Sequence, residues 1–262
     1  MLFTPTLIDL EKDWLKNPNY SHGFLVPIIA AYMIWQKKGE IYSLPVKPSN
    51  WGSLIIIFGM IVYVVGNLGA EMFTMRFSII IMLFGISLFL FGKKITQKLA
   101  IPLAYLIFMV PIPAIIWNRI AFPLQIFVSK MAEIVIQNIG ISVLREGNIL
   151  YLANTALEVV DACSGLRSLI SLAALGAAFA YLSSHSNVKK WVLFVSALPI
   201  AILANVLRLS STAVLASYFG GGVAQGFLHE LLGMVTFFLG LILLFTLHKI
   251  PFATQRAKSS SK

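Results

Sequence analysis

The chain has 262 residues, of which 58% are hydrophobic and only 11% are charged. A soluble domain carries roughly 25% charged residues, so this composition excludes a soluble globular protein and indicates an integral membrane protein. The formal net charge is +10, and the single cysteine excludes an internal disulfide and any metal site built from several cysteines.

Long apolar runs predict an all-α fold, a polytopic bundle of about seven transmembrane helices. A helix needs about 20 apolar residues to cross the hydrocarbon core, and the first run is short for this purpose. We expect one integral membrane domain over residues 1–262, with a short basic cytoplasmic tail at 249–262. The predicted spans are 24–36, 51–70, 72–92, 98–117, 164–182, 190–210 and 230–248.

Residues 119–140 form a further helical stretch, in which polar residues recur every four positions and so make one stripe on a helix. They are Gln125, Ser129, Glu133 and Gln137. We expect an amphipathic helix at the outer membrane interface, or one packed among the spans, rather than an eighth span. Residues 141–160 break the helical pattern around Gly147-Asn148, which predicts a small extracytoplasmic hairpin, a platform on which an extended peptide could lie.

The lysine and arginine residues orient these spans. Most of them fall in the loops 37–47, 93–98 and 183–190 and in the tail. Because basic loops stay in the cytoplasm, we predict that the N-terminus lies outside and the C-terminus inside. The positive charge then faces the anionic inner leaflet of the bilayer, which explains it without a nucleic-acid partner.

Three reactive side chains reach the same outer face in this topology. Cys163 begins the span 164–182, and His229 begins the last span. Arg208 follows Lys190 by about 27 Å of helix, which brings it to the opposite interface. A thiol, a guanidinium and an imidazole therefore arrive at one depth from three helices.

These three groups suit acyl transfer. A helix N-terminus or a nearby cation favours the thiolate of a cysteine, the form that attacks a carbonyl. A histidine can give a proton to the leaving amine, and an arginine can stabilise the oxyanion. No cofactor or metal is required.

Other polar residues near the same face are secondary candidates. Arg167 lies one turn after Cys163 and is a rival for the arginine role. Asp161 and Glu158 could cap or orient the cysteine segment, and His22 is the remaining histidine on that side. Each also has a structural interpretation, as a loop charge, an ion pair or a packed side chain.

The motifs around these residues resemble the exosortase/archaeosortase family of polytopic membrane enzymes. The most specific stretch is "EVVDACSGLRSL", residues 158–169, followed by "PIAILANVLRL", residues 199–209, which carries an N-x-x-R pattern as Asn205 and Arg208. "HELLG", residues 229–233, supplies a histidine with a glycine four residues later, and "YSHGFLVP" at 20–27 begins the similar region. The resemblance implies that Cys163, Arg208 and His229 are the catalytic residues.

It also implies a cysteine peptidase or transpeptidase of the plasma (inner) membrane, with its active site on the extracytoplasmic face. The implied partners are the lipid bilayer, an acceptor amine of unknown identity, and membrane-anchored protein substrates with a C-terminal sorting signal of the PEP-CTERM type. The residues alone leave open a polytopic transporter, a membrane serine protease using Ser164, and a purely structural assembly protein.

Overall fold

The computed structural model describes residues 2–153, 155–159, 166–183, 186–220, 222 and 227–249, with the backbone alone for residues 227 and 229. Helices dominate these residues, so the all-α fold class is confirmed. Packing contacts divide the chain into two units, Met1–Ala114 and Ile115–Lys262.

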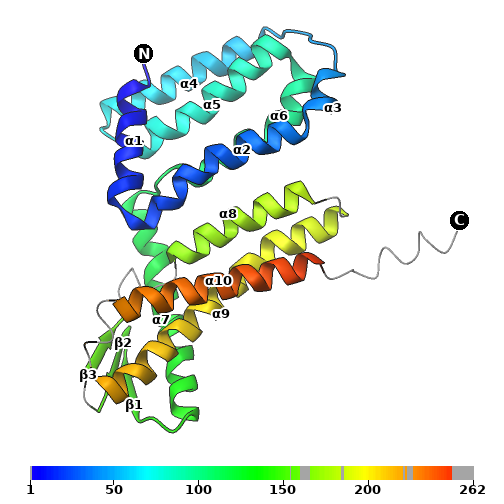
Figure 1. Ribbon diagram of the computed structural model, residues 1–262. Helices are drawn as coiled ribbons and strands as arrows, with labels where there is room; N and C mark the ends of the chain where they lie inside the picture. The colour runs from blue at the N-terminus through cyan, green and yellow to red at the C-terminus, as the bar shows by residue number, and fades with distance from the viewer. Residues whose placement is uncertain are drawn as a thin grey trace, which may run out of the picture. The chain divides into compact units, whose positions relative to one another are not determined.

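The first unit consists of helices joined by short turns (Figure 1). Its α-helices are α1 (Thr4–Lys16), α2 (Leu25–Gln36), α3 (Lys38–Tyr42), α4 (Trp51–Leu68), α5 (Met72–Phe91) and α6 (Lys93–Tyr105). Two 3₁₀ helices, η1 (Pro18–Phe24) and η2 (Leu106–Met109), complete it.

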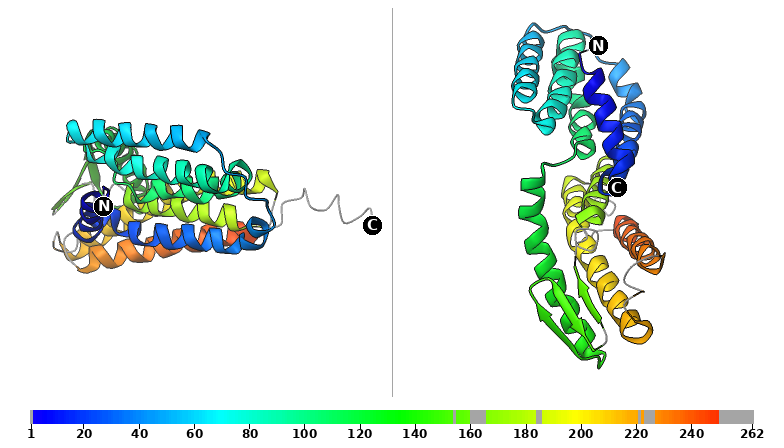
Figure 2. Two further views of the ribbon diagram at one scale, coloured as in Figure 1. Left: turned by 90° about the horizontal axis from the view of Figure 1, so that it is seen from above. Right: turned by 90° about the vertical axis from the view of Figure 1, so that its left-hand side faces the viewer.

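Glycines bring α4 and α5 into close antiparallel contact (Figure 2). Gly52, Gly59 and Gly66 recur every seven residues on α4 and all face α5. A Cβ added at Gly66 would lie only 2.9 Å from the backbone nitrogen of Met75, so no larger residue fits there. Small residues that let helix backbones approach closely are typical of membrane helix pairs.

Two of the basic loops predicted to be cytoplasmic lie together at one end of this unit. Lys98, in the second turn of α6, and Lys37, after α2, both bond to Glu40 of α3, at 2.6 and 2.8 Å. These hydrogen bonds from Lys37 and Lys98 lower the pKa of Glu40 to about 2. The backbone nitrogen of Lys47 also donates to the carbonyl of Phe91 at 3.3 Å, which ties the 37–47 loop to the end of α5.

The predicted span 98–117 is not one helix. The helical path ends with η2 at Met109, and α7 (Ala114–Asn138) begins five residues later. Pro111 and Pro113 stand in the gap; each lacks an N–H donor, and each disfavours the helical conformation of the residue before it. Most of the segment 119–140 therefore belongs to a helix that starts at Ala114. The prediction had instead assigned residues 114–117 to the preceding span, 98–117.

In the described residues, the second unit combines four α-helices with a small sheet (Figure 1). Besides α7, its helices are α8 (Leu166–Leu182), α9 (Asn187–Phe219) and α10 (Phe227–Lys249). A Cβ added at Gly176 of α8 would lie 3.1 Å from Ala197 of α9, and one added at Gly240 of α10 would lie 3.0 Å from Leu172 of α8. The three C-terminal helices thus pack against one another through small residues.

The predicted hairpin is present and has a third strand. Strands β1 (Val143–Glu146), β2 (Ile149–Leu152) and β3 (Thr155–Glu158) form an antiparallel sheet in the order β1-β2-β3. Gly147 has φ +62° and is the first residue of the two-residue turn between β1 and β2, where such a turn requires a positive φ. The turn signal at Gly147-Asn148 is thereby explained.

The sheet packs on α7 and on the C-terminal half of α9 (Figure 2). Leu150 and Leu157 of the sheet share a buried core with Val128 and Ile136 of α7 and with Ala213 of α9. The polar stripe of α7 takes part in this packing, because Ser129 is fully buried and Gln125 is 7% exposed. Glu133 pairs with Arg145 of β1 at 3.1 Å, and Gln137 donates to the carbonyl of Val143 at 3.3 Å.

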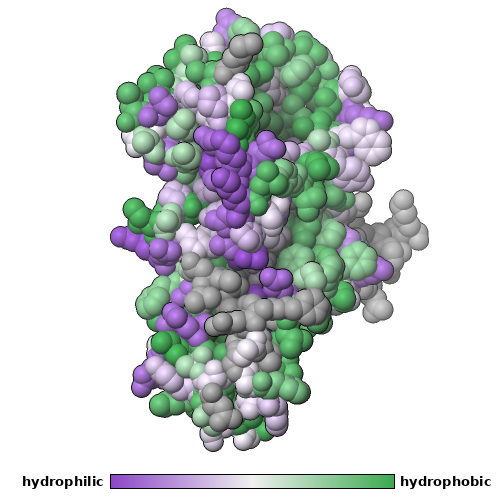
Figure 3. Space-filling view, turned by 60° about the vertical axis from the view of Figure 1, so that its left-hand side comes forward, coloured by the Kyte–Doolittle hydropathy of each residue, from purple (hydrophilic) through white to green (hydrophobic). Residues whose placement is uncertain are grey.

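Within the described residues, five helices are long and apolar enough to cross a membrane: α4, α5, α7, α9 and most of α10. The predicted count of about seven is not confirmed, since α2 has 12 residues and α8 has 17. Apolar side chains cover much of the surface (Figure 3), including Phe58 and Leu68 of α4, which are 57% and 81% exposed. Such a surface requires lipid around it, so the protein is a multi-pass membrane protein.

Candidate active site

Arg208 and α10 meet through Gly233. Arg208 lies on α9 and is half-buried. A Cβ added at Gly233 would lie 3.1 Å from both Cζ and Nη2 of Arg208 and 3.3 Å from its Nε. The guanidinium of Arg208 therefore packs against the backbone of α10 at Gly233, where an added Cβ would force it to shift.

His229 is in the first helical turn of α10, four residues before Gly233. Residues four apart lie on the same face of a helix, one turn above each other. The structure describes only the backbone at His229. Two of the three predicted catalytic positions thus lie on facing helices. Arg208 of α9 contacts Gly233 of α10, and His229 lies one turn of α10 before Gly233.

Asn205 precedes Arg208 by three residues on α9, which places both on neighbouring parts of one helix face. Asn205 is 3% exposed. A buried amide needs hydrogen-bond partners, so this residue belongs to the internal packing of the second unit beside Arg208.

Cys163 and its neighbours Asp161 and Ser164 lie outside the described residues, in segment 160–165. The described residues on either side, Val159 and Leu166, are 0% and 3% exposed. The Val159 nitrogen donates to the carbonyl of Asn148 at 2.9 Å, and the Asn148 side chain donates to the carbonyl of Val159 at 3.3 Å. The cysteine segment is therefore joined to the core of the second unit at both ends.

The other candidates are distributed over both units. Arg167 is half-buried in the first turn of α8, and Glu158 is exposed at the end of β3. His22 belongs to η1 of the first unit, where its Nε2 lies 3.2 Å from the carbonyl oxygen of Phe108. Burial lowers the pKa of His22 below 6.5. Among the described residues, no cluster of three or more His, Cys, Asp or Glu side chains could hold a metal ion.

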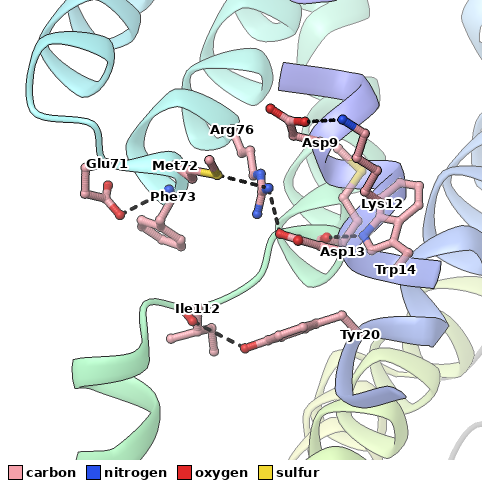
Figure 4. A network of polar contacts seen from close by, with 11 residues as sticks. Asp9, Lys12, Asp13, Trp14, Tyr20, Glu71, Met72, Phe73, Arg76 and Ile112 are labelled. Atoms are coloured by element: carbon pink, nitrogen blue, oxygen red, sulfur yellow. Dashed lines mark hydrogen bonds and ion pairs between the residues drawn. The ribbon is translucent and has the colours of Figure 1, made fainter. Parts of the chain in front are cut away.

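His22 is one of several side chains that bond to the carbonyls where η2 ends. Trp14 donates from its indole nitrogen to the carbonyl of Met109 at 2.9 Å, and the Tyr20 hydroxyl donates to that of Ile112 at 3.3 Å (Figure 4). A helix end leaves carbonyl groups without helical partners, and the prolines at 111 and 113 cannot donate to them. Side chains of α1 and η1 satisfy these carbonyls instead.

An ion pair between a buried arginine and a partly exposed aspartate lies beside this network and was not predicted. Arg76 of α5 is 2% exposed, and its Nη2 lies 2.7 Å from Oδ2 of Asp13 on α1 (Figure 4). Glu71 caps the start of α5 by accepting from the backbone nitrogens of Phe73 and Thr74. An arginine inside an apolar run was the available signal, because a charge at that position requires a partner.

A family model described as transmembrane exosortase matches residues 14–246, nearly the whole chain. The chain belongs to the transmembrane exosortase family. No curated protein and no solved structure matches the chain. Membership of the exosortase family supports a membrane peptidase or transpeptidase, and it implies membrane protein substrates with sorting signals in a lipid bilayer.

Proposed function

We propose that this exosortase is a membrane cysteine peptidase or transpeptidase that cleaves C-terminal sorting signals from exported proteins. Cys163 is the nucleophile, His229 moves the proton and Arg208 stabilises the oxyanion. The single observation that carries the proposal is the packing of the Arg208 guanidinium against Gly233, one helical turn from His229. The two units act as one catalytic domain.

The proposed reaction has two steps. The Cys163 thiolate attacks the scissile carbonyl carbon, the oxygen takes the negative charge beside Arg208, and the C–N bond then breaks while His229 protonates the leaving amine. In the second step an acceptor amine, or water, attacks the thioester and the C–S bond breaks. The first choice gives transpeptidation and the second gives hydrolysis.

Chain connectivity supports the participation of Cys163. Cys163 follows Val159 by four positions in the sequence, and a stretch of that length reaches at most about 14 Å. Val159 shares a buried core with Leu209, the residue after Arg208. The length of chain between Val159 and Cys163 is therefore compatible with a reaction that uses both Cys163 and Arg208.

The small sheet supports an extracytoplasmic site. A short open sheet cannot lie in lipid, because its unpaired backbone groups would have no water to bond. Helix α9 has 33 residues, or about 50 Å, whereas the hydrocarbon core is about 30 Å thick. The part of α9 that packs on the sheet, from Leu209 to Ala216, is the part that can extend beyond the bilayer.

The proposal is tested by co-expressing one sorting-signal substrate with variants of the enzyme and following cleavage by immunoblot. Cys163→Ala and Cys163→Ser both abolish processing, because an alcohol at this position ionises far less readily than a thiol. Ser164→Ala, the matched neighbour, retains at least part of it. Processing that persists in Cys163→Ala excludes the cysteine mechanism, and loss in Ser164→Ala alone favours a serine protease.

A further inference from the structure

Among the described residues, strand β3 is an edge strand, and Cys163 follows its last residue by five positions in the sequence. In the order β1-β2-β3 it pairs with β2 on one side only. It ends at Glu158, and the chain then passes through the buried Val159 into the segment that carries the cysteine. An edge strand offers a row of backbone donors and acceptors to which another strand can be added.

The register determines which residues of β3 offer these groups. Val159 is opposite Asn148, and its N–H donates to the Asn148 carbonyl, so Val159 turns its backbone groups toward β2. Along an antiparallel strand, successive residues turn these groups to alternate sides. Leu157 and Thr155 therefore also face β2, whereas Ala156 and Glu158 direct their N–H and C=O groups to the open edge.

The two edges of the sheet differ. On β1 the same alternation directs Val143 outward, and its carbonyl accepts a hydrogen bond from Gln137 of α7. On β3, the described part of the chain provides no backbone or side-chain bond to Ala156 or Glu158 at the open edge. Both residues are exposed, whereas Leu157 between them is 5% exposed and anchors the strand in the core.

We propose that the open edge of β3 binds an extended segment of the protein substrate as an added strand, through the backbone groups of Ala156 and Glu158. This inference rests on the proposed function and specifies how the substrate is held. Backbone pairing carries affinity without requiring particular side chains. Cys163 follows the end of β3 by five residues in the sequence, so we expect a peptide paired with β3 to present its scissile bond to this proposed nucleophile.

Ala156→Pro is the test on the enzyme. Proline removes the outward N–H and blocks strand addition, but it spares the β2 ladder, because edge strands tolerate proline where the N–H faces away from the sheet. We expect kcat/KM for substrate cleavage to fall about tenfold, as expected for the loss of one or two backbone hydrogen bonds. The rate of Cys163 alkylation by iodoacetamide, which needs no strand pairing, stays at the wild-type value.

Two control variants isolate the edge. Ala153→Pro adds the same ring in the turn before β3, leaves the edge groups in place, and processes at the wild-type rate. Ala156→Val keeps the N–H, so its loss is several-fold smaller than that of Ala156→Pro. Equal kcat/KM values for Ala156→Pro and wild type overturn the proposal.

A scan of the substrate removes dependence on the folding of any variant. Peptides that contain the cleavage site are N-methylated at one residue at a time and cleaved by the wild-type enzyme. Strand addition predicts that cleavage falls at every second position, because alternate N–H groups point toward β3. A uniform response, or one without a two-residue period, contradicts it. If the scan shows no two-residue period while Cys163→Ala is inactive, only strand addition at β3 is rejected. If Cys163→Ala remains active, the proposed function itself is rejected.

Discussion

Arg208 offers planar donors at the boundary of two helices, and its geometry depends on a glycine. The guanidinium packs on Gly233, so its fork is held in one orientation relative to α10. Preorganised donors of this kind stabilise a developing oxyanion because they need no rearrangement during the reaction. A lysine would present one flexible point charge instead.

Arg208→Lys should therefore lose most processing while the protein still accumulates in the membrane. Removal of one oxyanion donor costs about 100-fold to 1,000-fold in rate, and we expect a loss in the lower part of this range. The measurement is the initial cleavage rate of one substrate at matched enzyme levels. Arg167→Lys is the matched control on α8; a larger loss there than in Arg208→Lys would assign the catalytic role to Arg167.

His22 makes stability depend on pH. Burial lowers its pKa below 6.5, so the folded protein keeps the imidazole neutral while an unfolded chain takes up a proton as the pH falls below about 6.5. Stability is then fully present above this pH and decreases below it. Between pH 7.5 and pH 5, the Tm of the wild type should fall more than that of His22→Gln. Equal decreases in both proteins would mean that His22 does not couple to folding.

An N-x-x-R pattern and a histidine with a glycine four residues later predict helix faces, and in the structure Arg208 contacts Gly233, one turn of α10 after His229. The catalytic roles of Arg208 and His229 stay predictions. The ion pair of Arg76 with Asp13 was not predicted. Its partners are 63 positions apart, and periodicity gives no information about which helices pack together.

Several helices match the predicted apolar runs, although α9 (Asn187–Phe219) extends nine residues beyond the predicted end at 210. The spans predicted at 51–70, 72–92 and 230–248 correspond to α4, α5 and α10. The predicted span 98–117 contains Pro111 and Pro113, which lack the N–H donor that a continuous helix needs. The prediction relied on the hydropathy of this run and did not take the two prolines into account. The third strand, Thr155–Glu158, was missed because Gly147-Asn148 was the only turn signal recognised in residues 141–160.

The contact between α9 and α10 at Gly233 can be tested by adding one methyl group. Gly233→Ala places a Cβ 3.1 Å from the guanidinium of Arg208, so Arg208 must shift by a few tenths of an ångström. We expect the cleavage rate to fall several-fold, since small displacements of a preorganised group reduce its effect.

Gly240→Ala is the matched control for this variant. It lies seven residues later on the same helix, and its added Cβ meets the flexible end of Leu172 at 3.0 Å. Both substitutions raise helix propensity by a similar amount, so stability does not distinguish them. Equal cleavage rates in the two variants would show that Arg208 does not need its present orientation.

We infer an orientation of the second unit in the membrane from its sheet. An open sheet requires water around its unpaired backbone groups, and this sheet packs on α7 from Val128 to Ile136 as well as on α9. We therefore expect that half of α7 to lie outside the hydrocarbon core, which leaves only about 14 residues of the helix to enter it. On this inference residues 119–140 do not form an additional span, although α7 is long and apolar enough to cross a membrane.

Reporter fusions test this orientation. A fusion after Lys190 should have cytoplasmic activity, and one inserted at Gly147, in an exposed hairpin turn, should have extracytoplasmic activity. If residues 119–140 formed an additional span, both positions would change sides: the Gly147 fusion would report the cytoplasm and the fusion after Lys190 would report the outside. That result would remove Arg208 and His229 from the face that exported substrates reach.

The measurement that tests the central claim most directly is the detection of the acyl-enzyme. Purified enzyme is mixed with a sorting-signal substrate in the absence of an acceptor amine, quenched in acid and digested for mass spectrometry. We predict a substrate fragment bound to the peptide that contains Cys163, released by neutral hydroxylamine as a thioester should be, and absent from Cys163→Ala. A substrate fragment on Ser164 that resists neutral hydroxylamine, or cleavage by Cys163→Ala, would contradict the account.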